Sequence, residues 1–349
     1  MKKKKMISNM ITYLMVIAAF IAVEFLRRGG MLSSLMTGLL VPICVYVVLA
    51  VSLNLVVGIS GELSLGHAGF MCVGAFAGAF FSKCFSELIT FGPVRLILAM
   101  VVGAAVAAVF GFLIGIPVLR LKGDYLAIVT LAFGEIIKNV MNIFYIGRDA
   151  EGFHFSVKDQ FSLGMAPDGK MIISGPMGIT GTPKDASFLA GVILILITLF
   201  IVFHLIDSRD GRAIMAIRDN RIAAESIGLE VTKFKLLAFT VSAALAGAAG
   251  TLYAHNLATL QAKKFDYNTS ILALVFVVLG GIGNIRGSII AAVALTLLPE
   301  LLRGLSDYRM LIYSIILIVV MIYNWAPKLQ TWREQHFGRL FHRNRKEAE

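Results

Sequence analysis

Ten apolar runs, most of them about the length of a membrane-spanning helix, are the feature of this sequence that most limits its fold. A helix needs about 20 mostly apolar residues to cross the hydrocarbon core of a bilayer. Charged residues make up only 15% of the chain, against about a quarter in soluble proteins. We therefore predict an all-α polytopic membrane protein of about ten transmembrane helices with Gly-rich breaks. The predicted spans are 7–26, 36–58, 67–85, 95–118, 124–146, 187–206, 236–256, 269–282, 288–303 and 309–325. The eighth and ninth form either two short spans or one broken hairpin.

The positions of Lys and Arg predict the orientation of these spans. Basic residues are densest at positions 2–5, in the connector 207–235 and in the tail 326–349, and such a bias marks the cytoplasmic side. We therefore expect both termini in the cytoplasm and the net charge of +11 to serve membrane orientation rather than nucleic-acid binding. Residues 1–325 form the predicted transmembrane domain, with an external loop at 147–186, followed by the basic tail.

The sequence lacks the motifs of several chemistries. The three cysteines, Cys44, Cys72 and Cys84, lie in apolar surroundings without metal-ligand spacing. The sole Gly-Lys pair, Gly169-Lys170, is followed by Met171, so the chain has no phosphate-binding P-loop. We expect no catalytic residues, no metal site and no cofactor.

A glycine-rich segment after the second span is the first candidate site. Glycine costs about 1 kcal/mol relative to alanine inside a helix, so five glycines between 58 and 74 do not suit a simple helix. Two interpretations remain open. One is a broken element beside a substrate path. The other is a tight turn followed by a small-residue packing face, with His67 as a hydrogen-bonded structural residue. The path residues proposed here are Asn54, Ser64, Gly66, His67, Gly69 and Phe70.

The fifth predicted span carries the second candidate. Glu135 and Lys138 are three residues apart and share a helix face. Ionisable residues inside a membrane mark either a pathway or an internal pair. A proton relay is one hypothesis, but an ion pair with Asn139 that fixes helix packing is favoured. Tyr125, Thr130 and Glu135 complete the predicted substrate path.

The connector 207–235, called here the coupling loop, is the third candidate. Its segment 213–228 predicts two short helices, with Asp219 or Asn220 as an N-cap and Gly228 just past the end. Ordered helices of mixed charge indicate a protein partner, although a solvated charged loop is the alternative. The residues expected to couple to that partner are Gly211, Arg212, Arg218, Asp219, Ile222, Ala223, Ala224, Glu225 and Gly228.

Four segments together resemble the larger membrane permease subunit of branched-chain amino-acid ABC importers. They are residues 61–69, 123–135, 211–228 and 279–287, the last reading Leu279-Gly280-Gly281-Ile282-Gly283-Asn284-Ile285-Arg286-Gly287. The resemblance implies a multi-pass protein of the bacterial plasma membrane that forms a heterodimer with a second permease. It also implies two cytoplasmic ATPase subunits, docked by the coupling loop, and an external substrate-binding protein. The loop departs from the wider class in its order Ala223-Ala224-Glu225.

Several functional alternatives stay open at this point. Similar permeases import urea, short amides or other amino acids. A secondary carrier would use Glu135 or Lys138 for ion coupling, and a membrane-embedded enzyme would use Glu62, His67 and Asp124.

Overall fold

The structure of the protein is a computed structural model that describes most of the chain. The described residues are 2–121, 123–149, 152–165 and 169–302, with isolated residues between 308 and 322. The chain divides into two compact units, Met1–Val293 and Ala294–Glu349. In the second unit the described chain is mainly the end of a helix that finishes at Leu301.

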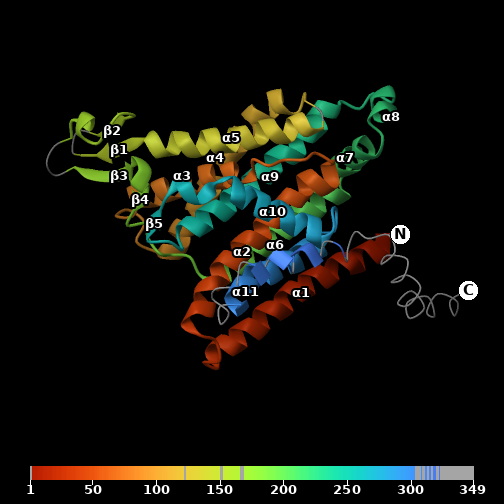
Figure 1. The fold of residues 1–349 in the computed structure, drawn as a ribbon, viewed down its shortest axis with the longest axis horizontal. Coiled ribbons are helices and arrows are strands. Elements are labelled where there is room, and N and C mark those ends of the chain that lie inside the picture. Colours follow the sequence, from red (N-terminus) through yellow and green to blue (C-terminus); the bar gives the residue numbers. More distant parts are fainter. Residues whose placement is uncertain are drawn as a thin grey trace, which may run out of the picture. The chain divides into compact units, whose positions relative to one another are not determined.

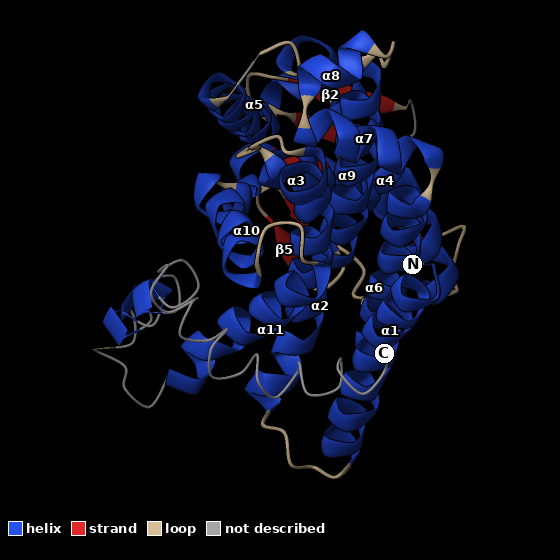
Figure 2. Ribbon diagram, turned by 90° about the vertical axis from the view of Figure 1, so that its right-hand side faces the viewer, coloured by secondary structure: helices blue, strands red, loops and turns tan. Residues whose placement is uncertain are grey.

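Helices form most of the first unit (Figures 1 and 2). Apolar runs of this kind favour helices, because a helix satisfies all of its backbone hydrogen bonds within its own segment and needs no water to do so. The long helices are α1 (Lys2–Arg28), α2 (Ser34–Asn54), α3 (His67–Cys84), α4 (Gly92–Val118), α5 (Asp124–Ile143), α6 (Phe188–Asp207), α9 (Val231–Ala254), α10 (Tyr267–Gly280) and α11 (Ile285–Leu301). A π-helical turn, η1 (Leu55–Ser60), continues α2 directly.

Six helices of the described chain are long and apolar enough to cross a membrane. They are Asn9–Arg28, Ser34–Ser60, Gly92–Val118, Asp124–Ile143, Phe188–Asp207 and Val231–Ala254, and each coincides with a predicted span. The predicted spans 67–85, 269–282 and 288–303 also form helices, α3, α10 and α11, but these are shorter or less apolar. Most of 309–325 and all of 326–349 lie outside the described residues. The fold is thus a multi-helix membrane architecture, and the full count of ten spans stays a prediction.

Helices α2, α3, α4 and α9 form the core of the first unit. Small residues let their backbones approach closely: a Cβ at Gly74 would collide with the backbone of Gly247, and one at Gly103 would meet Thr251. Membrane helices pack through such small-residue contacts because lipid supplies no hydrophobic drive between helices. The small-residue packing face predicted after the glycine-rich segment is therefore present.

The described chain also contains five short strands, so the all-α prediction was incomplete. Strands β1 (Tyr145–Arg148), β2 (Phe153–Ser156) and β3 (Lys170–Ser174) form an antiparallel sheet in the order β2-β1-β3, which we call the sheet module. Strand β4 (Ile179–Thr180) pairs with β5 (Thr259–Leu260). The predicted external loop 147–186 is polar and rich in turn residues, so its backbone groups find partners in strand ladders rather than in a long helix.

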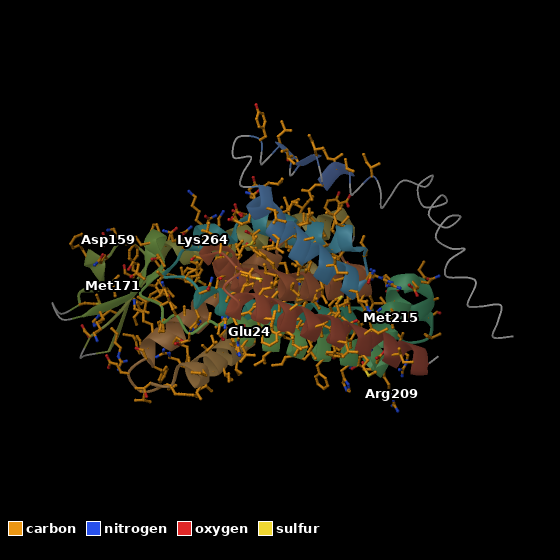
Figure 3. The ribbon with its side chains drawn as sticks, turned by 90° about the horizontal axis from the view of Figure 1, so that it is seen from below. Glu24, Asp159, Met171, Arg209, Met215 and Lys264 are labelled. Atoms are coloured by element: carbon orange, nitrogen blue, oxygen red, sulfur yellow. The ribbon has the colours of Figure 1, made fainter. Side chains whose placement is uncertain are left out.

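The coupling loop folds as two short helices, as its sequence predicts. Helix α7 (Arg209–Asp219) starts at the N-cap Ser208, and helix α8 (Arg221–Ser226) starts at the N-cap Asn220. Asn9 Nδ2 of α1 donates to Asp207 Oδ2 at 3.3 Å, which places the start of α1 beside this loop. The sheet module lies at the opposite end of the unit, where Asp159 and Met171 are far from Arg209 and Met215 (Figure 3).

Candidate functional site

The glycine-rich segment is a break between α2 and α3 that is packed inside the unit. Gly61 ends the π-helical turn in a left-handed conformation (φ 76°), which glycine adopts without the steric cost of a Cβ. Asn54 Oδ1 accepts from Gly283 N in the turn between α10 and α11, and Asn54 Nδ2 donates to Ser288 Oγ in the first turn of α11, both at 2.9 Å. Two glycine breaks that are distant in the sequence therefore lie against each other.

His67 begins α3 as a fully buried residue. Its Nε2 lies 2.8 Å from Ser52 Oγ on α2, and its ring meets Phe70 edge-on at a centroid distance of 6.4 Å. The neighbouring Ala68 N donates to Ser270 Oγ at 3.0 Å. These contacts match the structural role that the sequence favours for His67.

Gly66 and Gly69 bring the start of α3 into contact with α5. A Cβ at Gly66 would collide with the carbonyl of Thr130, and one at Gly69 would come within 2.9 Å of Gly134 Cα. Thr130 Oγ1 accepts from Leu65 N at 3.0 Å and donates to Ala127 O at 2.9 Å. Three of the predicted path residues thus form one tight helix contact.

Glu135 has two partners within the chain. One carboxylate oxygen pairs with Lys138, and the other accepts from Tyr267 N at 3.1 Å, at the first residue of α10. Burial alone would raise the pKa of the adjacent N-cap Asp266, but hydrogen bonds from Asn268 and Thr269 outweigh it and lower that pKa. Glu135 is therefore engaged in an internal pair with Lys138 and in capping α10, and neither of these two contacts includes Asn139.

Three predicted path residues differ sharply in exposure. Phe70 is buried against Phe239, with ring centroids 5.3 Å apart. Ser64 is also buried, and its hydroxyl has no hydrogen-bond partner among the described residues. Tyr125, near the start of α5, is exposed. The structure thus gathers eight of the nine predicted residues around the break and the α3–α5 contact and leaves Tyr125 on the surface.

One ion pair and one hydrogen bond from a charged side chain join the break to α9 and the coupling loop. Glu62 pairs with Lys235 of α9, and both side chains are nearly buried. Arg218 of α7 donates from Nη1 to Gly58 O at 2.9 Å. The sequence shows these charges but not their pairing, because the partners are about 160 residues or more apart. Glu62 and His67, two residues of the enzyme alternative, have separate partners, Lys235 and Ser52.

The coupling loop divides its isoleucines between two sides. Ile214 and Ile217 are buried, and Ile217 packs with Ala224 and Val231 in a small core. Ile222 and Ile227 are 81% and 75% exposed. Gly211 is buried against the backbone of the α6 end. Among the remaining predicted coupling residues, Arg212, Asp219, Ala223, Glu225 and Gly228 face outward, and Arg218 turns toward the break.

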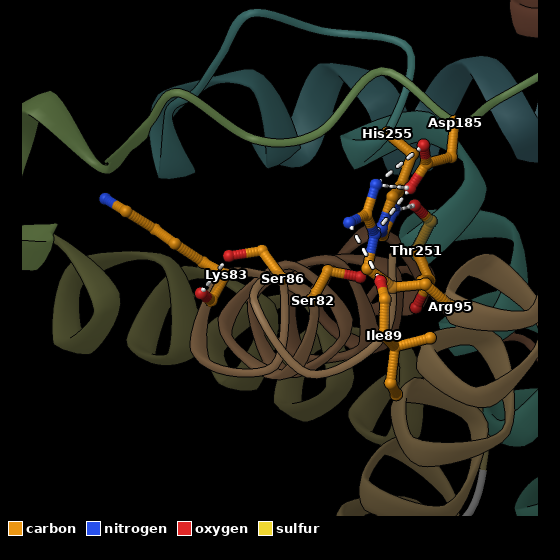
Figure 4. Close-up of polar contacts among 8 residues, drawn as sticks. All are labelled: Ser82, Lys83, Ser86, Ile89, Arg95, Asp185, Thr251 and His255. Carbon is orange, nitrogen blue, oxygen red and sulfur yellow. Dashed lines mark hydrogen bonds and ion pairs between the residues drawn. The ribbon is translucent and has the colours of Figure 1, made fainter. Parts of the chain in front are cut away.

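A polar network lies at the other end of the unit (Figure 4). Arg95 of α4 makes a two-pronged contact with Asp185, at 2.8 and 2.9 Å, with side chains only 11% and 14% exposed. His255 Nδ1 donates to Thr251 O at 2.8 Å, so its Nε2 accepts from Ser82 Oγ at 2.7 Å. Lys83 donates to Met171 O at 2.6 Å and so ties α3 to β3. Only hydrophilic residues flanking apolar runs hint at this network beforehand.

Comparison with known proteins identifies the family. Residues 35–322 match the sequence family described as the permease component of the branched-chain amino acid transport system. The chain belongs to this family. It is 36% identical over 293 residues to the high-affinity branched-chain amino acid transport system permease protein LivM of Salmonella typhimurium, covering 81% of this chain and 67% of that protein.

Two further relatives agree with this membership. LivM of Escherichia coli K12 shows the same 36% identity over 293 residues and the same coverage of both chains. A probable branched-chain amino acid transport permease of Methanocaldococcus jannaschii is 24% identical over 74% of this chain and 78% of its own length. No solved structure matches this chain. The protein is therefore a multi-pass permease component of an ABC transport system, rather than an enzyme.

Proposed function

We propose that this chain and a second, homologous permease together form the translocation path for leucine, isoleucine and valine in a bacterial plasma membrane. An external binding protein delivers the substrate, and two cytoplasmic ATPase subunits drive the cycle. The observation that carries the proposal is the family match over residues 35–322, together with relatives that are named for branched-chain amino acid transport.

Helix α5 is the favoured wall of the path. It is amphipathic, since Leu126, Ala127, Thr130 and Ile137 face the chain's own core. Its other sides expose Tyr125 and Asn139 together with the apolar Ile128 and Ile136, and leave Glu135 and Lys138 partly exposed. Exposed polar groups on a span are costly against lipid. A water-filled path bordered by the second permease would remove that cost.

The break at residues 54–70 has a supporting role in this proposal. Asn54, His67, Gly66, Gly69 and Phe70 hold α2, α3, α5 and the α10–α11 turn together. Ser64 is an exception together with Ser60 of the same break, because both hydroxyls are buried without a partner among the described residues, and such a group costs about 1–3 kcal/mol.

The coupling loop is the proposed docking element for an ATPase subunit. Ile222 is exposed on α8 and Ile227 is exposed just past its end, and the charged Arg212, Asp219 and Glu225 of the same loop are exposed as well. Apolar anchors ringed by polar groups are typical of protein interfaces. The buried Ile214 and Ile217 support the element from beneath.

ATP-dependent uptake is the test of the proposed function. The complex would be purified from its native membrane through a tag on this chain and reconstituted into vesicles. We expect uptake of labelled leucine, isoleucine and valine that requires ATP and a copurified binding protein. Uptake driven by a proton gradient without ATP would instead support a secondary carrier. Competition by urea or acetamide, but not by isoleucine, would overturn the substrate assignment.

Cysteine labelling tests the assignment of α5. Asn139→Cys should react with a water-soluble thiol reagent, and a saturating substrate concentration should slow the reaction. Ile136→Cys is the control. It lies at another exposed position of α5 and measures how accessible the helix is where the natural side chain is apolar. Equal reactivity with and without substrate at position 139 would contradict the proposed path.

A further inference from the structure

One guanidinium connects the coupling loop to the break between α2 and α3. Arg218 lies in the last turn of α7. Its Nη1 donates to Gly58 O at 2.9 Å, while its Nε and Nη2 donate to Asp219 Oδ1 at 3.0 and 2.9 Å. The planar fork of arginine can hold two acceptors at once, which the point charge of lysine cannot reproduce. Arg218 therefore bridges a backbone carbonyl of the break and a carboxylate of its own helix.

The carbonyl that Arg218 contacts lies at the end of a long helix. Helix α2 and the turn η1 run continuously from Ser34 to Ser60. The last carbonyls of a helix lack partners within it, and the partial negative charge at this end favours a cation. The stem of Arg218 also rests on Gly61, where a Cβ would come within 2.7 Å of Arg218 Cγ. The carbonyl of Gly58 and the missing Cβ at Gly61 therefore both accommodate the side chain of Arg218.

The far side of Gly58 is packed against the second break. A Cβ on Gly58 would collide with both Asn54 Oδ1 and the backbone of Gly283. Asn54 in turn binds Gly283 N and Ser288 Oγ. Contacts therefore run without a gap from α7 through Gly58 to the start of α11. Such a contiguous series of packed groups can carry a displacement, because close-packed interiors transmit strain.

We propose that Arg218 is a positioning residue that transmits movement of the coupling loop to the break, and that it does not serve as an ATPase contact. The inference rests on the proposed function, in which Ile222 and Ile227 dock the ATPase. A docked subunit that shifts α7 pulls or releases the carbonyl of Gly58. The two glycine breaks then move together, and the α3–α5 contact beside the proposed path moves with them.

The test compares Arg218→Gln with Arg209→Gln in the reconstituted complex. Both substitutions remove one charge from α7, but Arg209 lies at the opposite end of that helix from the contact with Gly58 O. For Arg218→Gln we expect normal ATPase attachment and hydrolysis, with leucine uptake reduced about tenfold or more, within the 5- to 150-fold range of typical coupling energies. Arg218→Lys should show the same defect, and Arg209→Gln should behave as the unmodified protein.

Hydrogen exchange supplies a readout that a purely structural role would not change. ATP should alter exchange in both 209–226 and 55–66 of the unmodified complex. In Arg218→Gln the change in 209–226 should remain and the change in 55–66 should disappear. Gly61→Ala retains Arg218 but displaces its stem, so it should give the same pattern if Arg218→Gln proves unstable.

Three results would overturn the inference. Uptake and exchange of Arg218→Gln that match the unmodified complex would show that the contact transmits nothing. Loss of ATPase attachment in Arg218→Gln would make Arg218 a docking residue, with the docking assignment of the loop left standing. Uptake by the unmodified complex without ATP would overturn the proposed function, and this inference with it.

Discussion

The sheet module and the coupling loop lie at opposite ends of the same unit and are attached to it in different ways (Figure 3). Near the sheet module, polar side chains tie α3, α4, α9 and the segment before α6 through Arg95–Asp185, Ser82–His255 and Lys83–Met171. Helices α7 and α8 of the coupling loop instead rest on the buried Ile214 and Ile217 and, among the described residues, on one long-range polar contact, Arg218–Gly58. Directional hydrogen bonds fix the relative positions of the elements they join, whereas a small apolar contact allows two packed elements to slide against each other. We therefore expect the end near the sheet module to be more rigid than α7 and α8.

Removing Asp185 should cause the largest loss of stability. Asp185→Ala leaves the nearly buried Arg95 without its carboxylate, and breaking a buried pair in this way costs about 3–5 kcal/mol. Thermal unfolding of the purified complex measures the loss. Glu87→Gln is the matched control, because the pair of Glu87 with Lys170 is fully exposed, and it should leave the melting temperature unchanged. Equal effects of the two substitutions would mean that the Arg95–Asp185 contact does not hold this end rigid.

Truncating a buried anchor of the coupling loop should have the next largest effect. Ile217→Ala removes a fully buried side chain from the core it forms with Ala224 and Val231, and such truncations cost about 2–5 kcal/mol. We expect faster hydrogen exchange confined to 209–226, with the sheet module unchanged. If 145–174 also exchanges faster, the two ends are not independent and the comparison fails.

An exposed anchor of the same loop should affect attachment rather than stability. Ile222→Asp replaces a side chain that is 81% exposed, so the melting temperature should stay the same. Loss of an interface anchor often costs more than about 1 kcal/mol of binding. A titration of ATPase subunits against the tagged permease measures this loss. Unchanged affinity would remove the docking assignment while leaving the fold of the loop intact.

The smallest effect belongs to Glu225. It pairs with Arg221 at 2.8 Å on the surface of α8, and exposed helix pairs of this spacing contribute about 0.3–0.5 kcal/mol. Glu225→Gln should therefore lower neither attachment nor uptake measurably. A loss as large as that of Ile222→Asp would show that charge, not apolar contact, dominates docking.

Local features of the loop were readable from the sequence. Asn220 caps α8 by accepting from Ala223 N at 3.0 Å, and Gly228 follows the helix with φ 85°. Both roles depend on residues only a few positions apart, so local chemistry decides them. The division of the isoleucines into buried and exposed pairs was not readable, because it depends on how α7 meets α9.

For the predicted path residues, too, the sequence indicates burial but not the contacts that the residues make. The sequence singled out Asn54 and His67 as polar groups that lipid would penalise, and both are indeed buried. Their partners, Gly283 and Ser52, are decided by helix packing. A polar residue in an apolar run needs a hydrogen-bond partner, but the sequence of that run does not indicate which residue the partner is.

By itself, the sequence determined that this chain is a helical membrane protein without its own ATP-binding loop, since apolar runs and missing motifs are local properties of the chain. It also determined the family, through segments spread over residues 61–287 that keep their order. The tertiary structure alone decided that the breaks near Gly58 and Gly283 touch, that Arg218 reaches Gly58, and that Arg95 meets Asp185. These contacts join residues 90–229 positions apart. Such pairings follow from how closely small residues allow whole helices to approach, which depends on all the helices at once.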